Sequence, residues 1–225
     1  MSNKAHPILF STPMVQAIME GRKTQTRRVV KPQPSDNWMQ NVFSLCPTYN
    51  MYRSNGEQMF WLSDGKDDEI KCPYGKPRDL LWVRETSIIN KNSCRRFFVA
   101  DGYHKSISEE TGKPFPYEKV VPSIFMPKMA ARIWLEITNI KVERLQDISA
   151  ADAINEGVNF YDDDVIGRCY KDYMGDASGY GNSDVDFHTT HNPITSFQTL
   201  WQSINGEESW NANPWVWAIE FKTTK

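Results

Sequence analysis

Long apolar runs are missing from this sequence. No stretch comes near the roughly 18–20 consecutive apolar residues that a membrane-spanning helix needs. The segment from Met1 to Pro7 also lacks the charged, apolar and small-residue pattern of a secretory signal peptide. We therefore expect a cytoplasmic protein that makes no contact with a membrane.

Cysteine is scarce, with 4 among 225 residues. No two cysteines form a Cys-x-x-Cys pair, the spacing typical of zinc ribbons and of dithiol redox sites. Because nothing else indicates secretion, we expect reduced, partly buried thiols rather than disulfides. The four positions are Cys46, Cys72, Cys94 and Cys169.

Two histidines in an acidic segment have a spacing that could suit metal binding. His188 and His191 stand close together, and Asp184 and Asp186 precede them. Their segment, however, has no helical periodicity that would hold these side chains in one register. We therefore expect no metal and no other cofactor.

The net charge of −2 argues against a protein that coats nucleic acid along its length. The charges are unevenly distributed, since residues 22–31 contain five cations and no acid. Residues 147–192 contain ten acids and only two cations, Arg168 and Lys171. A local cationic segment on an acidic chain suits a small anionic ligand or a short contact with one nucleic-acid strand.

Strands are predicted wherever short apolar runs are bounded by turn residues. The clearest run, residues 131–145, has apolar side chains at odd positions as far as Ile137. Its apolar positions then change face near Asn139, so a bend or bulge is expected there. Shorter strands are predicted at residues 8–10, 29–30, 80–86, 96–100 and 215–221.

Fewer helices than strands are predicted, and proline and glycine residues mark the ends of two of them. Pro13 opens one helix that Gly21 ends, and Pro193 opens another that Gly206 ends. A third, short helix covers residues 150–156. The first and last strands could pair, and a small β-barrel with short helices is the expected architecture.

Four blocks of sequence follow one another in the order found in a known family. The first, Gly21-x-Lys23-x-x-x-x-Arg28, lies after a predicted helix and before a predicted strand. Together the blocks resemble the ASCH-domain family of the PUA-like β-barrel superfamily, in particular its longer phage and prophage members. The other three blocks are residues 75–85, 152–157 and 217–221.

This resemblance implies an α+β fold, a small PUA-like β-barrel with short flanking helices. Residues 1–225 are then a single domain, with insertions at about residues 35–70 and 159–192. The second insertion is rich in Asp, Gly and Tyr and is expected to be a loop. Many family members have glycine where this chain has Arg78, a departure that is expected to alter a turn.

The family resemblance also implies a function. ASCH domains are thought to bind RNA or nucleotides in a cleft beside a helix. Some small bacterial members are amidohydrolases that remove the acetyl group of N4-acetylcytidine, using lysine, threonine and glutamate without a metal. Carried over by motif, these three catalytic positions fall on Lys23, Thr26 and Glu156.

The chemistry of such a site makes specific demands on the three side chains. The Thr26 hydroxyl is a weak nucleophile that needs a base, and Lys23 can act as one if neighbouring arginines lower its pKa. Glu156 can then pass a proton to the leaving nitrogen. Positions 23 and 26 point to opposite faces of a regular strand, so we predict irregular backbone at residues 22–25.

Further residues are candidates for substrate binding. Arg22 and Arg28 could dock an anionic group. Trp82 and Arg84 share one face of a predicted strand, where a base could stack on Trp82 while Arg84 holds a phosphate or carbonyl. Glu85 follows them and completes the predicted binding set. Core packing with an ion pair is the equally open alternative for this strand.

Three functions stay open at this point. The leading hypothesis is a metal-independent amidohydrolase that acts on N4-acylcytidine or a related modified nucleoside. The second is a non-catalytic module that binds RNA, DNA or a nucleotide in the same cleft. The third is a phage accessory protein whose insertions bind a host factor. The sequence does not determine the oligomeric state.

Overall fold

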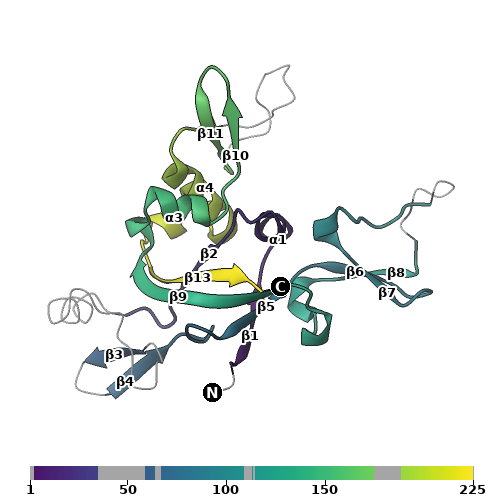
Figure 1. The fold of residues 1–225 in the computed structure, drawn as a ribbon, viewed down its shortest axis with the longest axis horizontal. Helices are drawn as coiled ribbons and strands as arrows, with labels where there is room; N and C mark the ends of the chain where they lie inside the picture. Colours follow the sequence, from purple (N-terminus) through teal and green to yellow (C-terminus); the bar gives the residue numbers. More distant parts are fainter. Residues whose placement is uncertain are drawn as a thin grey trace. The chain divides into compact units, whose positions relative to one another are not determined.

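The computed structural model describes residues 3–34, 59–63, 67–108, 113, 115–174 and 189–224. The chain divides into two compact units, drawn together in Figure 1. None of the helices in the described ranges is long and apolar enough to cross a membrane. Unit 1 comprises Met1–Gly21, Pro73–Thr138 and Phe221–Lys225, and unit 2 comprises Arg22–Cys72 and Asn139–Glu220.

Among its described residues, unit 1 contains one helix of more than a single turn, and it shares two long strands with unit 2. These two strands are β9 (Trp134–Arg144) and β13 (Trp215–Thr223). Its other elements are β1 (Ala5–Leu9), α1 (Thr12–Met19), β5 (Leu80–Arg84), β6 (Ser87–Asn90), β7 (Arg95–Phe98), η1 (Val99–Asp101), β8 (Glu118–Val121), η2 (Ser123–Phe125) and η3 (Lys128–Ala130).

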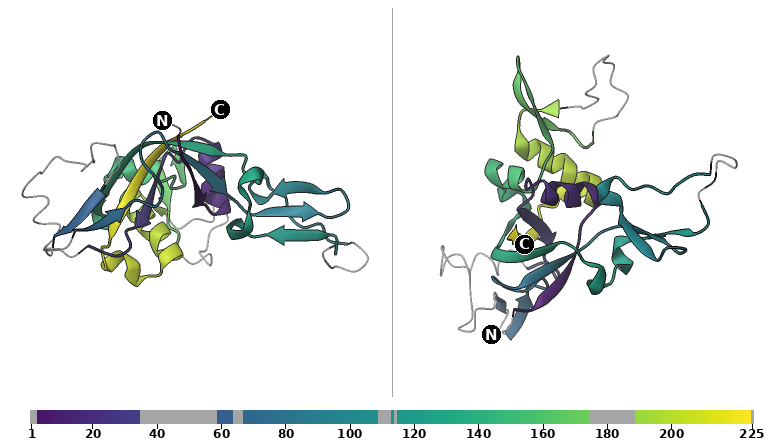
Figure 2. Two further views of the ribbon diagram at one scale, coloured as in Figure 1. Left: turned by 90° about the horizontal axis from the view of Figure 1, so that it is seen from below. Right: turned by 45° about the vertical axis from the view of Figure 1, so that its right-hand side comes forward.

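Unit 2 holds the remaining helices. The right-hand view of Figure 2 shows the longest of them, α4, beside the β10–β11 hairpin. Its elements besides β9 and β13 are β2 (Gln25–Val29), β3 (Met59–Ser63), β4 (Asp67–Lys71), η4 (Leu145–Asp147), α3 (Ala150–Asn155), β10 (Phe160–Asp163), β11 (Gly167–Lys171), β12 (Thr189–Thr190), α4 (Pro193–Asn205) and α5 (Glu208–Asn211).

The core of unit 1 forms where β1, β5 and the start of β9 pair. β1 runs parallel to β5, with Ile8 opposite Val83, and β5 runs antiparallel to β9, with Leu81 opposite Leu135. All four side chains are buried, which explains the apolar runs in these segments. Strands β7, β6 and β8 form a separate antiparallel sheet in the same unit.

The core of unit 2 lies between β13 and the helices α3, α4 and α5. Phe197 and Trp201 stand four residues apart on α4, so they lie on one face, and both are buried in this core with Val216 of β13. The start of α4 is set locally, because the Asn192 side chain accepts a hydrogen bond from the Ile194 amide at 2.9 Å.

The strand order of the largest sheet is β1-β5-β9-β13-β2. Strand β1 pairs with β5, and β13 pairs with β2, so the expected pairing of the first and last strands is not observed in the described part of the chain. No closed barrel is found among these strands either. The α+β class is confirmed, while the PUA-like barrel and the single-domain organisation stay predictions.

The predicted change of face within the long strand is confirmed. In β9 the side chain of Ile137 is buried and that of Thr138 is exposed, whereas the next buried position is Ile140. An even interval would have kept the same face, and the interval of three residues does not. The change lies where β9 passes from unit 1 to unit 2, between Thr138 and Asn139.

Each of the two predicted insertions contains a β-hairpin. The first includes the β3–β4 hairpin, while its residues 35–58 lie outside the described ranges. The second was expected to be a loop, and this is wrong for residues 160–171, which form the β10–β11 hairpin. In the segment of His188 and His191, where no metal is expected, His191 contacts the Arg168 carbonyl at 3.3 Å. His188, Asp184 and Asp186 lie outside the described residues.

Arg78 occupies a backbone conformation that suits glycine. Its φ angle is 78°, and its amide donates to the Ile137 carbonyl at 2.8 Å. A side chain in this left-handed region is strained, which glycine avoids. We expect the free energy of unfolding of Arg78→Gly to exceed that of Arg78→Ala by about 0.5–1 kcal/mol, the strain that remains after the extra chain entropy of glycine is subtracted. Urea unfolding measures this difference. Equal stabilities of the two variants would show that the strain at this turn is no larger than the entropy cost of glycine.

Candidate functional site

The basic segment after α1 is irregular before it becomes a strand. Gly21 has a φ of 74°, the left-handed conformation that ends many helices. Lys23 forms an isolated antiparallel bridge with Glu156, and the Thr24 amide donates to the Asn155 carbonyl at 2.9 Å. The predicted irregular backbone is thus found at residues 22–24, whereas Gln25 already belongs to β2.

Lys23 and Glu156 form a buried pair. The Lys23 Nζ atom donates to Glu156 Oε2 at 2.8 Å and to the Glu156 carbonyl oxygen at 2.7 Å. Only 1% of the Lys23 side chain and 4% of the Glu156 side chain are exposed. Two of the three residues expected to be catalytic are therefore in direct contact, at the end of α3.

Burial changes the acidity of this lysine. Loss of hydration lowers the pKa of Lys23 below its usual value, since the charged ammonium group is the form that burial disfavours. Attraction and hydrogen bonding to Glu156 oppose this shift, and repulsion from Arg28 and Arg27 adds to it. Lys23 therefore gives up its proton more readily than a lysine in water does.

Arg27 lies at the centre of a larger group of charges around this pair. Its guanidinium donates to Glu143, at 2.9 Å from Nε, and to Glu156 Oε1, at 3.1 Å from Nη1. Asp152 Oδ2 lies 3.4 Å from Arg27 Nη2, and Lys141 pairs with both Glu143 and Asp152. We call Lys23, Arg27, Lys141, Glu143, Asp152 and Glu156 the charge cluster.

The charge cluster is balanced, with three cations and three acids. Although partial burial opposes it, a hydrogen bond from Ser149 and the nearby cations Lys141 and Arg27 lower the pKa of Asp152. The acid therefore stays ionised at neutral pH. While Lys23 is protonated, each charge of the cluster has a partner of opposite sign, and the cluster carries no net charge.

Thr26 lies on the other face of β2. In the amide orientation that satisfies both partners, Gln25 donates to Asp152 at 3.0 Å and accepts from Arg27 at 3.2 Å. Because side chains alternate along a strand, Gln25 and Arg27 face the charge cluster, and Thr26 and Arg28 project from the opposite face. No described hydrogen bond joins Thr26 to Lys23 or Glu156, so the structure does not bring the three expected catalytic residues together.

The other expected binding residues lie on β5 and directly after it, in unit 1. The Arg84 guanidinium lies 5.5 Å from the centre of the Trp82 ring, and Trp82 is buried. Glu85 is buried and accepts from Arg132 at 2.8 Å and 3.0 Å. The structure thus shows the core packing and ion pair that were the alternative for this strand, and substrate binding by these residues stays a prediction.

A cavity of about 310 Å³ is lined by residues that are close in sequence to Lys23 and Glu156. Arg22 precedes Lys23, and its Nη1 donates to the Gly157 carbonyl, directly after Glu156, at 3.2 Å. Neither member of the pair is itself in the wall of this cavity. Its walls are formed by Arg22, Asn159, Phe160, Tyr161 and Lys171.

Several residues of this site were missed in the sequence, although some had a detectable signal. Asp152 and Glu156 stand four residues apart at a predicted helix, a spacing that places both on one face. Gln25 and Arg27 alternate on a predicted strand in the same way. Glu143 gave no such signal, because its contact with Arg27 depends on bringing two distant segments together.

Comparisons with family models, with curated proteins and with solved structures give no match for this chain. The resemblance to ASCH domains therefore depends on the sequence motifs alone.

Proposed function

We propose that this protein is a metal-independent amidohydrolase that removes the acyl group of N4-acylcytidine or a related modified nucleoside. In this proposal the chain is a PUA-like protein of the ASCH type. The single observation that carries the proposal is the buried Lys23–Glu156 pair, in which a lysine of lowered pKa contacts a carboxylate. Enzymes often place groups of shifted pKa where a proton must be transferred.

The pair can carry out the proton transfers that amide hydrolysis requires. Deprotonated Lys23 accepts a proton from the nucleophile as the nucleophile attacks the acyl carbon. The proton then passes through Glu156 to the N4 nitrogen as the C–N bond breaks, which yields cytidine and a carboxylic acid. The 2.8 Å contact between Nζ and Oε2 provides the path between the two groups.

The position of Thr26 bears on the identity of the nucleophile. Its side chain projects from the face of β2 opposite to Gln25 and Arg27, and it is buried. We infer that a water molecule activated by Lys23 attacks the acyl carbon, and that Thr26 packs within the sheet. Thr26→Val, which removes the hydroxyl but keeps the shape, is expected to retain the turnover rate of the wild-type protein with N4-acetylcytidine.

Loss of turnover in folded Thr26→Val would instead assign the nucleophile to Thr26 and require β2 to rearrange on substrate binding. A burst of product release followed by slower turnover in the wild-type protein would indicate an acyl-enzyme and support the same conclusion. Thr24→Val is a suitable control, because this neighbouring threonine is exposed and its side chain has no part in the proposal.

The test of the proposal is incubation of the purified protein with N4-acetylcytidine, followed by chromatography for cytidine. The same assay is run with EDTA, and activity is expected to persist because no step uses a metal. A series of acyl groups, from formyl to butyryl, covers substrates of different size. The absence of cytidine release from every member of the series would contradict the proposal.

A non-catalytic nucleotide-binding module is the second candidate. The observation that favours it is the burial of the Lys23–Glu156 pair, which hides both groups from a ligand in the neighbouring cavity. In this case the charge cluster would fix β2 against α3, and the cavity would bind a nucleotide unchanged. Binding of cytidine or its phosphate without any conversion of acylated substrates would support this candidate over the first.

A further inference from the structure

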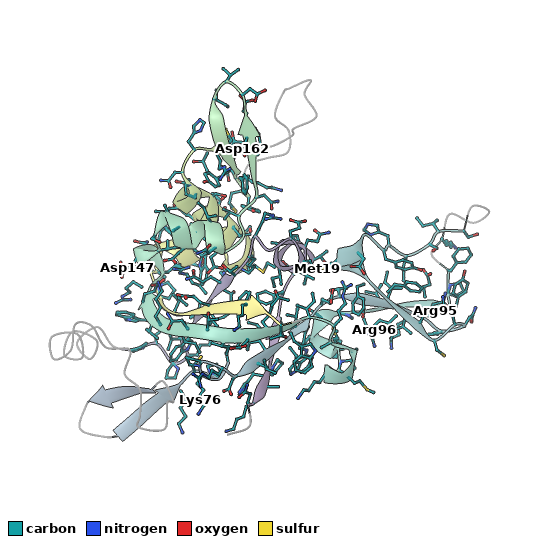
Figure 3. The ribbon with its side chains drawn as sticks, in the orientation of Figure 1. Met19, Lys76, Arg95, Arg96, Asp147 and Asp162 are labelled. Carbon is teal, nitrogen blue, oxygen red and sulfur yellow. The ribbon has the colours of Figure 1, made fainter. Side chains whose placement is uncertain are left out.

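The register of the β10–β11 hairpin sorts its side chains onto two faces. Figure 3 labels Asp162 on this hairpin. Tyr161 lies opposite Cys169, and the Lys171 amide donates to the Asn159 carbonyl at 2.9 Å. Because side chains alternate along each strand, Asn159, Tyr161 and Lys171 project from one face. These three residues line the cavity together with Arg22.

The opposite face of the hairpin has partners of its own. There Arg168 pairs with Asp162 at 2.8 Å and 3.0 Å, and its guanidinium lies 4.2 Å from the centre of the Phe160 ring. Phe160 lies opposite Tyr170 in the register of the hairpin, and it also lines the cavity. The two cations of β11, Arg168 and Lys171, therefore lie in different environments.

The wall of the cavity contains two cations and no acid. The acids of the hairpin are engaged elsewhere: Asp162 pairs with Arg168, and Asp163 accepts from the amides of Val165 and Ile166. These contacts lower the pKa of each acid, which therefore stays ionised at its own partners. Arg22 and Lys171 thus give the cavity a local positive charge within an acidic segment.

We infer that this cavity binds the phosphate of a nucleotide, so that a phosphorylated nucleoside is bound more tightly than a free one. This inference depends on the proposed function for the identity of the base. Lys171 and Arg22 hold the phosphate by charge-assisted hydrogen bonds, and the Tyr161 ring offers a surface on which the base can stack. A guanidinium has five N–H donors, enough to hold both the Gly157 carbonyl and an anion.

The size and the position of the cavity fit this ligand. A volume of about 310 Å³ is at the lower end of the roughly 300–1,000 Å³ found for small-molecule sites, which suits one nucleotide. Arg22 is anchored at Gly157, the residue after Glu156. A nucleotide held there lies beside the chain segment that carries the proposed proton donor, which gives the phosphate a role in positioning the acylated base.

The test is calorimetric titration of the protein with cytidine 5′-monophosphate, cytidine, inorganic phosphate and a cytidine tetranucleotide. Cytidine monophosphate is expected to bind at least about tenfold more tightly than cytidine, the effect of one charge-assisted hydrogen bond. Lys171→Gln should remove most of this difference. Arg168→Gln is the matched control, because it removes the same charge from the same strand on the opposite face, and it should leave the difference unchanged.

The remaining arms separate the sources of the phosphate and the two proposals. Tighter binding of the tetranucleotide than of the mononucleotide would assign the site to a nucleic-acid strand rather than a free nucleotide, with the phosphate contact retained. Equal affinity for cytidine and its monophosphate, or equal losses in the two variants, would overturn the inference even if N4-acetylcytidine is hydrolysed. Conversely, Lys171-dependent binding of cytidine monophosphate without any hydrolysis would support the inference while the amidohydrolase proposal fails.

Discussion

Replacing Glu156 by glutamine is expected to lower kcat/KM for N4-acetylcytidine by about 10²–10⁴-fold, the contribution of one general acid or base. Glutamine keeps the size and planarity of the side chain, so it can still contact Lys23 and Arg27. It cannot carry the proton that the N4 nitrogen needs when it leaves. The rates are measured by chromatography, with circular dichroism to show that the variant is folded.

Glu143→Gln is the matched control for this experiment. Glu143 is also an acid of the charge cluster that contacts Arg27, but it makes no described contact with Lys23. Its loss is expected to reduce stability and to leave the turnover rate unchanged once the protein is folded. If the two variants lost activity to the same degree, the effect would belong to the cluster as a whole, and Glu156 would have no particular role in proton transfer.

The pH dependence of the reaction provides a separate check on Lys23. A lysine acts as a base only when it has lost its proton, so the rate should rise as the pH rises toward the pKa of Lys23. Because burial lowers this pKa, the rise is expected at lower pH than for a lysine in water. Lys23→Met should abolish the rise, and a flat profile in the wild-type protein would argue that Lys23 is not the base.

Local signals in the sequence were sufficient to predict helices α1, α3 and α4, whereas the short helix α5 was not predicted. Pro13 and Pro193 lie in the first turns of α1 and α4, and Gly206 directly follows α4, as their preferences for helix ends indicate. The apolar run of β13 was also predictable, since Trp215 to Ile219 are all buried. Each of these elements is specified by neighbours in the chain and needs no knowledge of distant contacts.

The β10–β11 hairpin was missed because its strands show no extended apolar alternation and lie in a segment rich in Asp, Gly and Tyr. Only Cys169 and Tyr170 in these two strands are buried, so the apolar pattern is too short to indicate strands. The hairpin is stabilised instead by cross-strand pairs such as Asp162 with Arg168. A pair of this kind becomes visible only when the register of the two strands is known.

The candidate site was predicted in part for a similar reason. The motif pointed to Lys23 and Glu156, and the structure joins them. Arg27 appeared in the sequence as one cation among several that could lower the pKa of Lys23. Its central place depends on the contact of β2 with α3 and β9, segments more than one hundred residues away. Such long-range packing is not encoded in the spacing of a local motif.

Replacing Arg27 by methionine is expected to destabilise the protein by about 3–5 kcal/mol, the cost of leaving buried charges without their partner. The Arg27 side chain is fully buried, and it contacts Glu143, Asp152 and Glu156. Without it, three acids face two cations, Lys23 and Lys141. Urea unfolding monitored by tryptophan fluorescence measures the change, which corresponds to a loss of roughly 10 °C in Tm for a chain of this length.

An exposed arginine of the same chain provides a comparison for the effect of burial on the stability of an ion pair. Arg168 also pairs with an acid at 2.8 Å, but 47% of its side chain and 62% of that of Asp162 are exposed. Water and salt screen such a pair, so Arg168→Gln should cost no more than about 1 kcal/mol. Arg27→Lys keeps the positive charge, but the single ammonium group of lysine cannot contact three acids as the planar guanidinium does. We therefore expect a loss of stability between those of the other two variants. Similar losses for Arg27→Met and Arg168→Gln would mean that water reaches the charge cluster and that Lys23 is not desolvated, which would also remove the basis for its lowered pKa.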